Sequence, residues 1–220
     1  MKPFVFNEKN AFCISLESNP TRWDRMQSRF SQFDLKVTKW IASTRDTIID
    51  NFPDYLNDGQ KGCSQSHINI WRHIVENDLE YALILEDDAC FDKKWIEKLS
   101  LFTETNQDMD WHMILLNASE PIEITDQWVC TINKEQYLTG GYIISNKGAK
   151  IILNDFKNCF FSADWMTSRD QLYGHSYCYY PWLIIQEGKD SNIGENLEAD
   201  HAKVLRCLGE INYSIENYII

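Results

Sequence analysis

The stretch Tyr81-Ala82-Leu83-Ile84-Leu85-Glu86-Asp87-Asp88 decides the fold of this protein. Its first five residues are mostly apolar and do not alternate with polar ones. That pattern predicts a strand buried on both faces, as in a parallel sheet covered by helices. Three carboxylates follow where the strand should end. Because ligands of open α/β sheets bind just outside the carboxyl ends of the strands, this acidic turn is a candidate binding site.

Two interpretations of the acidic turn are open at this point. Three adjacent acids repel one another unless a positive group lies among them. A divalent cation that carries a phosphate ligand would supply that charge. The alternative is a solvated turn without a function, because short acidic runs usually face water.

The length and charge of the chain limit the kinds of partner it can bind. Its 220 residues suit one sizeable domain with a C-terminal appendage. A net charge of −12 argues against a nucleic-acid surface, which needs a basic patch, and gives no support for docking on anionic lipid. An acidic protein that handles an anionic ligand must therefore hold it with a cation or with a few well-placed arginines.

The cysteines and the N-terminus bear on location. The seven cysteines lie far apart and no pair has CxxC spacing, which favours reduced thiols over a disulfide framework or a zinc site. The N-terminal Met1-Lys2-Pro3-Phe4 lacks the apolar core of a signal peptide, and no apolar run approaches the roughly 20 residues that span a bilayer. The sequence predicts a cytoplasmic protein with no transmembrane segment.

The remaining segments alternate between apolar strands and periodic helices. Strands are expected at residues 11–16, 35–41, 111–116, 142–145 and 182–185, and helices at 20–33, 62–76, 95–102, 147–153 and 162–172, with an irregular loop at 45–61. This alternation predicts an α/β architecture with a largely parallel sheet. We expect one domain over residues 1–195, and a tail over 196–220 that packs on it or leads to a further domain.

Two helix starts carry polar side chains that could bind a ligand. Arg22 and Arg25 lie in the opening turns of a helix that begins at Asn19-Pro20, where the free backbone N–H groups favour anions. They are candidates for a phosphate clamp, and the alternative is a solvated basic face. His67 is expected in the first turn of a helix that begins at Gly62, either as a site residue or as a packed or solvated histidine.

These segments together resemble glycosyltransferase family 25, which contains lipopolysaccharide galactosyltransferases and collagen galactosyltransferases. The resemblance covers residues 11–193 and leaves the tail after Asn192 unmatched; Ser162-Ala163 also replaces a proline-containing approach to Asp164. Six motifs in the family's order carry it: Ile14-Ser15-Leu16 with Arg22 and Arg25, Gly62-Cys63-Ser64-Gln65-Ser66-His67 with Trp71, Ala82 to Asp88, Thr139 to Ser145 with Gly148-Ala149, Asp164, and Gln186 with Ser191.

The resemblance implies a GT-A fold, a Rossmann-like αβα sandwich that binds a nucleotide sugar at the carboxyl ends of its first strands. The implied reaction moves a hexose, such as galactose or glucose, from a nucleoside diphosphate sugar (foremost a UDP-sugar) to a hydroxyl of a glycan or glycoprotein. Mn²⁺ or Mg²⁺ would neutralise the departing diphosphate.

The resemblance also assigns expected roles to individual residues. Asp88 is expected to ligate the metal directly, with Glu86 nearby. His201 lies beside Asp200 in the unmatched tail, and it is a further candidate ligand that does not come from the resemblance. The expected nucleotide-sugar-binding residues are Ser15, Leu16, Arg22, Arg25, Ala42, Ser43, Ser66, His67, Glu86 and Asp87.

Inversion at the anomeric carbon, which the resemblance suggests, requires a general base. A carboxylate suits that role and contributes about 10²–10⁴-fold to the rate. Asp164 is the expected base, and Asp170, further along the same helix, is the reserve. The alternative for Asp164 is simple stabilisation of the first helical turn.

Two other functions remain open on the sequence. A nucleotidyltransferase acting on sugar phosphates also sets acids at strand ends, but Ser15-Leu16-Glu17-Ser18 lacks the glycine-rich loop such enzymes carry after the first strand. A non-catalytic domain that binds nucleotide sugars is the second, against which the intact acidic triplet and Asp164 argue.

Overall fold

The computed structural model describes residues 2–105, 109–121, 127–188 and 197–220, the last range without the side chains of residues 197–200. Its main sheet has seven strands in the order β2-β1-β3-β7-β5-β8-β6. The strands are β1 (Ala11–Ser15), β2 (Thr38–Ile41), β3 (Tyr81–Glu86), β5 (Met113–Leu115), β6 (Val129–Cys130), β7 (Gly141–Ser145) and β8 (Ser176–Cys178).

The pairing pattern confirms a mostly parallel sheet. β1 is parallel to β2 and to β3, and β5 is parallel to β8. β7 lies between β3 and β5 and runs antiparallel to both, and β6 runs antiparallel to β8, so five of the seven strands point the same way. β7 is buried on both faces, and such a strand has the same continuous apolar sequence whichever way it runs.

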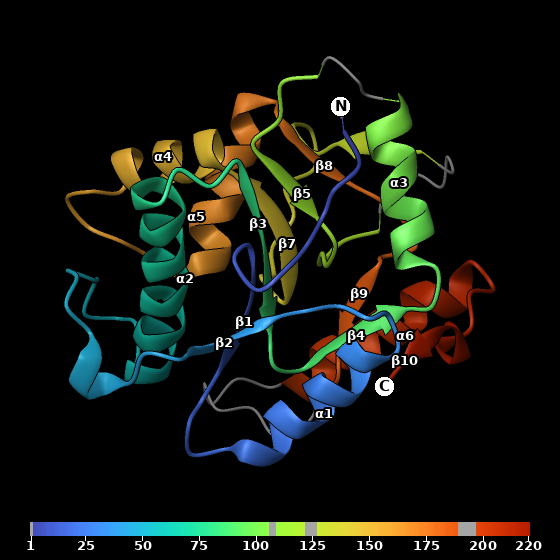
Figure 1. Ribbon diagram of the computed structural model, residues 1–220, viewed down its shortest axis with the longest axis horizontal. Coiled ribbons are helices and arrows are strands. Elements are labelled where there is room, and N and C mark those ends of the chain that lie inside the picture. Colours follow the sequence, from blue (N-terminus) through green and yellow to red (C-terminus); the bar gives the residue numbers. More distant parts are fainter. Residues whose placement is uncertain (1, 106–108, 122–126, 189–196) are drawn as a thin grey trace.

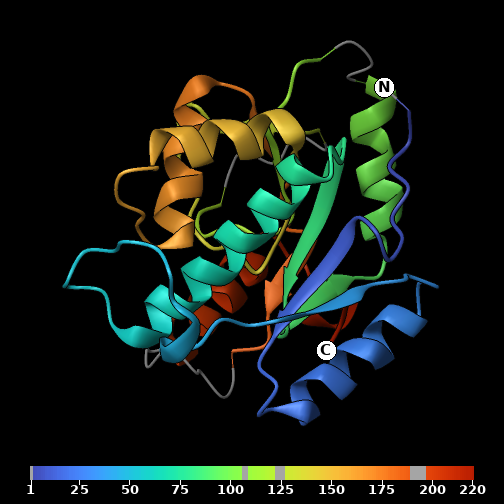
Figure 2. The same ribbon diagram turned by 60° about the vertical axis from the view of Figure 1, so that its left-hand side comes forward.

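Helices cover both faces of the sheet, which confirms the αβα sandwich (Figures 1 and 2). Along β3, Ala82 and Ile84 pack on the side of α2, α4 and α5, whereas Leu83 and Leu85 pack on the side of α1 and α3. Because each face meets a helix layer, the strand has no polar side. The helices are α1 (Pro20–Ser31), α2 (Asp58–Glu76), α3 (Trp95–Thr105), α4 (Asn146–Asp155), α5 (Ala163–Asp170) and α6 (Leu197–Glu210).

Helix α2 begins four residues before the expected Gly62. Asn57 caps it: the Asn57 side chain accepts from the backbone N–H of Gln60, and the Gln60 side chain accepts from the N–H of Asn57. This capping box satisfies helix-end donors within a segment whose polar composition predicted a loop. Consequently His67 lies in the third turn of the helix, so its expected first-turn position is wrong. The short helix η1 (Arg45–Thr47) precedes α2.

A second, antiparallel sheet lies beside the end of β3. Its order is β10-β4-β9, made of β10 (Tyr218–Ile219), β4 (Ala89–Asp92) and β9 (Ile184–Gln186). The strand expected at residues 182–185 therefore starts two residues later and belongs to this smaller sheet. The acidic turn connects the two sheets, because β3 ends at Glu86 and β4 begins at Ala89.

The C-terminal tail packs on the domain. β10 pairs with β4, with Tyr218 opposite Asp92, and the hydroxyl of Tyr180 donates to the carbonyl of Cys207 in α6 (2.9 Å). The expected boundary at residues 195 and 196 lies outside the described residues, so the division into two parts stays a prediction. Within the described ranges no helix combines the length and the apolar character that a membrane span requires. The cytoplasmic location also stays a prediction.

Candidate functional site

The acidic turn is buried rather than solvated. Asp87 is 7% exposed, Asp88 is 3% exposed, and the side chain of Glu86 is 18% exposed. The interpretation of this segment as a solvated turn is therefore wrong. Buried carboxylates need compensating charges or hydrogen bonds, so the surroundings of each acid decide its protonation.

Arg22 supplies the positive charge inside the acidic turn. Its Nη2 lies 2.6 Å from Asp87 Oδ1 and 3.2 Å from Asp88 Oδ2, and the residue is 5% exposed. Burial opposes the charge on Arg22, but Asp88 and Asp87 outweigh it and raise the pKa of the guanidinium. The first turn of α1 thus places a permanent cation between two of the three acids.

One guanidinium does not balance three carboxylates. Burial, together with the charge of Glu86, raises the pKa of Asp88 to about 7 despite the neighbouring Arg22. Burial also raises the pKa of Asp87. Oxygen donors that remain under-compensated in a buried turn are the ligand set that Mg²⁺ and Mn²⁺ take up, so the residues present fit a divalent cation.

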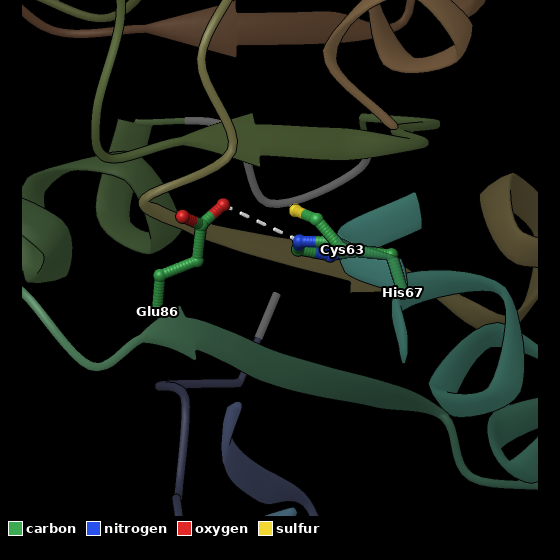
Figure 3. Close-up of side chains that lie close together, drawn as sticks. All are labelled: Cys63, His67 and Glu86. Atoms are coloured by element: carbon green, nitrogen blue, oxygen red, sulfur yellow. Dashed lines mark hydrogen bonds and ion pairs between the residues drawn. The ribbon is translucent and has the colours of Figure 1, made fainter. Parts of the chain in front are cut away.

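Glu86 has different surroundings from the two aspartates. Its Oε1 accepts a hydrogen bond from Thr139 Oγ1 (2.7 Å) and lies 3.4 Å from His67 Nε2 (Figure 3). Burial opposes ionisation of Glu86, but the contacts with His67 and Thr139 outweigh it and lower the pKa of the carboxyl. Glu86 is therefore the acid of the turn that stays ionised most readily.

A buried hydrogen-bond chain orients His67. Trp71 Nε1 donates to the hydroxyl of Tyr142 (2.9 Å), and that hydroxyl lies 2.8 Å from His67 Nδ1. With the Tyr142 hydroxyl donating to Nδ1, the ring proton of neutral His67 is on Nε2 and faces Glu86. These hydrogen bonds hold the His67 ring next to Glu86. Burial raises the pKa of Tyr142 well above its ordinary value.

A cavity of about 280 Å³ opens in front of the acidic turn. It lies at the carboxyl ends of β1, β2 and β3, where the α/β rule places ligands. Eight of the expected site residues line it: Ser15, Leu16, Arg22, Ala42, Ser43, Glu86, Asp87 and Asp88. The rest of its lining was not expected: Ile14, Thr44, Arg45, Asp58, Gly59, Cys63 and Gln186.

Ser66 acts through the loop that lines the cavity. Its hydroxyl donates to the carbonyl of Gly62 (2.8 Å) and accepts from the backbone N–H of Ser43 (2.8 Å). A Cβ on Gly62 would lie 2.5 Å from the carbonyl oxygen of Ser43, so only glycine permits this approach. Ser66 therefore positions Ser43 and is not itself among the residues that line the cavity.

The same turns of α2 hold two other segments. Ser64 Oγ accepts from the backbone N–H of Ala163 at the start of α5 (2.9 Å). Gln65 Oε1 accepts from the N–H groups of Ile49 and Asp50 (3.1 and 3.0 Å). The segment from Gly62 to His67 therefore fixes neighbouring segments through the side chains of Ser64, Gln65 and Ser66. Cys63 lines the cavity and lies next to Glu86 and His67 (Figure 3).

The structure separates the two arginines of the expected phosphate clamp. Arg22 lines the cavity, whereas Arg25 does not. Arg25 Nε lies 3.3 Å from Glu187 Oε2, and Arg29 Nη2 lies 3.3 Å from the same oxygen. Arg25 therefore holds the segment that follows β9.

The two candidate bases occupy different parts of the molecule. Asp164 is half-buried in the first turn of α5, and its Oδ1 accepts from the backbone N–H of Trp165 (2.8 Å). Asp170 is 2% exposed, with Oδ1 3.1 Å from His112 Nδ1 and Oδ2 accepting from Ser176 Oγ (3.1 Å). The start of α5 lies against α2 next to Cys63, whereas Asp170 lies by the amino ends of β5 and β8, away from the cavity.

His201 approaches the site through Gln186. Its Nδ1 lies 3.1 Å from the carbonyl oxygen of Gln186, whose side-chain amide Nε2 lies 3.5 Å from Asp88 Oδ1. Gln186 and Thr139 belong to the sequence motifs, but the motifs assign neither residue a role in the site. Both residues are more than 50 positions from the acids they contact, so only the sheet order brings them together. Ser191 lies outside the described residues.

Comparison with known proteins gives a family match. The family described as "Glycosyltransferase family 25 (LPS biosynthesis protein)" matches residues 8–167. Procollagen galactosyltransferase 1-A of Xenopus laevis is 31% identical over an alignment of 169 positions, which covers 65% of this chain and 28% of that protein. Lipooligosaccharide biosynthesis protein lic2B of Haemophilus influenzae is 26% identical over an alignment of 226 positions, which covers 88% of this chain and 84% of that protein.

The matches differ in how much of each relative they cover. The chain spans 28% of the length of the Xenopus procollagen galactosyltransferases 1-A and 1-B. Among solved structures, a glycosyltransferase involved in the glycosylation of the major capsid of PBCV-1 aligns with a TM-score of 0.40 and 8% identity. That alignment covers 88% of this chain and 97% of the solved one.

Proposed function

This chain belongs to glycosyltransferase family 25, and on that premise we propose that it transfers a hexose from a nucleoside diphosphate sugar to a hydroxyl of a glycan or glycoprotein. The observation that carries the proposal is the buried acidic turn with Arg22 at the edge of a cavity, at the carboxyl ends of three parallel strands. Burying these acids costs desolvation energy, which favours a site that holds a cation over an acidic turn without a function.

The donor is proposed to lie with its diphosphate at the acidic turn. The nucleoside, uridine foremost, would lie between the end of β1, residues 42–45 and the start of α2, whose side chains make up the less charged part of the lining. Arg22, which lines the cavity at the acidic turn, would donate charge-assisted hydrogen bonds to the phosphates. Ser66 contributes by holding Ser43 in place.

Mn²⁺ or Mg²⁺ is the proposed cofactor. Asp88, with its raised pKa and its carboxylate on the cavity, is the proposed direct ligand, with Glu86 beside it and His201 as a candidate on the far side of Gln186. When bound, the ion would neutralise the charge that develops on the departing diphosphate. Thr139 and His67 would keep Glu86 ionised and oriented for that task.

Asp164 is the proposed general base of an inverting reaction. It is half-buried, and its Oδ1 accepts from the next backbone N–H. Asp164 is not among the described residues that line the cavity, but Ala163 ties its helix to α2 beside it. A carboxylate in that position could accept the proton of an acceptor hydroxyl. Asp170 serves less well, because both of its oxygens already have buried partners.

The acceptor is proposed from the relatives' names and coverage. The match to the lipooligosaccharide biosynthesis protein extends over 84% of that protein, which favours a bacterial oligosaccharide acceptor over collagen. Galactose is the first donor sugar to test, because the procollagen relatives are named galactosyltransferases.

A donor-binding experiment tests this function. The melting temperature of the purified protein is measured with UDP, UDP-galactose and UDP-glucose, with Mn²⁺ or with EDTA, followed by release of UDP without acceptor. We expect stabilisation by UDP and its sugars that requires Mn²⁺ and is lost in Asp88→Ala, together with slow Mn²⁺-dependent hydrolysis of one sugar nucleotide. Binding without hydrolysis would indicate a non-catalytic module, and use of a nucleoside triphosphate with a sugar phosphate would indicate a nucleotidyltransferase.

A further inference from the structure

A second group of side chains that could bind a metal lies at the amino ends of β5 and β8, at the opposite end of the main sheet's strands from the acidic turn. Asp110, His112 and His175 each offer a ligand atom, and these atoms all lie within 4.8 Å of one another. His112 precedes β5 and His175 precedes β8, and both strands run in the direction of β3. The cluster is therefore at the amino ends of the strands, whereas the acidic turn follows the carboxyl end of β3.

The sheet itself brings the two histidines together. β5 and β8 are parallel neighbours with Met113 opposite Ser176 (Figure 1). One residue earlier, the backbone N–H of His112 donates to the carbonyl of His175 (2.7 Å), and the ring centroids are 4.7 Å apart. Because strand register sets this spacing, the pair is preorganised and does not depend on long flexible side chains.

The buried histidine has an unused ring nitrogen. His112 is 2% exposed, and its Nδ1 lies 3.1 Å from Asp170 Oδ1. Its Nε2 is buried and has no hydrogen-bond partner among the described residues. A buried polar atom without a partner requires an explanation, and a bound ion is one. With Nδ1–H donated to Asp170, Nε2 presents a lone pair.

His175 lies on the solvent side of the cluster. Its Nδ1 lies 3.1 Å from the carbonyl oxygen of Asp110 and 4.0 Å from Asp110 Oδ2. With Nδ1–H donated to that carbonyl, Nε2 of the neutral ring presents a lone pair. The Asp110 carboxylate is half-exposed and also pairs with Lys147. A carboxylate or carbonyl that accepts from the second ring nitrogen is the usual outer partner of a metal-binding histidine.

We propose that Asp110, His112 and His175 bind a divalent transition-metal ion of the zinc class. Two neutral imidazoles and one carboxylate are a ligand set that suits Zn²⁺, with water completing the coordination. His112 forms the buried end of the site, and the half-exposed Asp110 and His175 leave a path for the ion. The ion would link the amino ends of β5 and β8 and stabilise the pairing of these two strands. It would not take part in donor binding.

Histidine NMR combined with zinc titration tests the proposal. The chain has five histidines, so each ring gives a separable signal. Metal-stripped protein is titrated with Zn²⁺, and the rings are assigned with His112→Gln and His175→Gln. We expect one Zn²⁺ per chain, changes confined to the rings of His112 and His175, and a higher melting temperature that His175→Gln abolishes. Asp170→Asn should weaken Zn²⁺ binding by about 10–100-fold.

A matched control separates this site from the donor site. Cys63, His67 and Glu86 also lie within ligand distance of one another, so Cys63→Ser reports zinc bound there. The proposal requires that Cys63→Ser retain the binding that His175→Gln loses. Zinc binding that disappears in Cys63→Ser alone, or signals of His112 and His175 that do not move, would overturn it and leave a water molecule as the partner of Nε2. His175 is half-exposed, so its replacement should not prevent folding.

Discussion

Arg22 and Asp87 form a buried ion pair, with Nη2 of the arginine 2.6 Å from Oδ1 of the aspartate and side chains only 6% and 9% exposed. The same guanidinium lies 3.2 Å from Asp88. In the metal-free protein, Arg22 therefore offsets part of the repulsion and desolvation cost of the buried carboxylates. A divalent ion near Asp88 would share that task.

Replacing Arg22 should destabilise the metal-free protein. Arg22→Met keeps much of the side-chain volume but leaves two buried acids without their cation, which costs about 3–5 kcal/mol of unfolding free energy. The measurement is urea unfolding in EDTA and in Mn²⁺, with Arg25→Met as the matched control on the same helix. We expect Mn²⁺ to restore part of the lost stability in Arg22→Met. Equal losses in the two variants, with no effect of Mn²⁺, would contradict this role.

Replacing Asp88 should stabilise the metal-free protein at neutral and alkaline pH. Its folded-state pKa of about 7 lies above the unfolded value of 3.8, so between these values the folded protein binds more protons than the unfolded one. The free energy of unfolding consequently falls as the pH rises through that window. Asp88→Asn removes this term and should gain on the order of 2 kcal/mol at pH 8 relative to pH 5.

Unfolding of wild type and Asp88→Asn in EDTA, from pH 5 to pH 8, measures that difference. Mn²⁺ with UDP should then stabilise the wild type and leave the variant unchanged. A stability difference that is independent of pH, or one that shrinks as the pH rises, would show that Asp88 does not titrate in this way.

Thr139 should control the ionisation of Glu86. Thr139→Val removes the 2.7 Å hydrogen bond to Glu86 at nearly constant shape, so the lowered pKa of Glu86 should rise toward its ordinary value. A depressed folded-state pKa contributes stability above the unfolded pKa of 4.5 and loses it as the pH falls. The variant should be less stable by about 1 kcal/mol at pH 7, and the difference should shrink in acid.

Thr139→Ser is the control for that experiment, because it keeps the hydroxyl group and removes only a methyl group. Unfolding curves at pH 4 and pH 7 compare the three proteins. If Thr139→Ser were as strongly affected as Thr139→Val, packing and not the hydrogen bond to Glu86 would explain the loss.

Variants of the two candidate bases, Asp164 and Asp170, should differ in turnover and in melting temperature. Asp164→Asn should lower kcat by about 10²–10⁴-fold while UDP binding, measured by calorimetry, stays unchanged. Asp170→Asn should mainly lower the melting temperature, because Asp170 holds His112 and Ser176. An Asp164→Asn variant with normal turnover would require another base. Acceptor-free hydrolysis serves as a second readout if the acceptor has not been identified.

Much of the fold was predictable because it depends on local patterns. The apolar run of β3 and the periodic spacing of α1 and α3 express burial and helical geometry within a few residues. The direction of β7 and the start of α2 were not predictable in the same way. A doubly buried strand has no polar face to show its direction, and the capping residues Asn57 and Gln60 are also typical of loops.

The sequence by itself determined the αβα class, the acidic turn at the end of a buried strand, and the placement of Arg22 in the first turn of the helix that follows β1. Only the tertiary structure decided which groups meet there. Thr139 reaches Glu86 across 53 positions, and Asp170 reaches His112 across 58. Such contacts depend on the order and direction of strands, which arise from packing the whole chain, so no local run of residues encodes them.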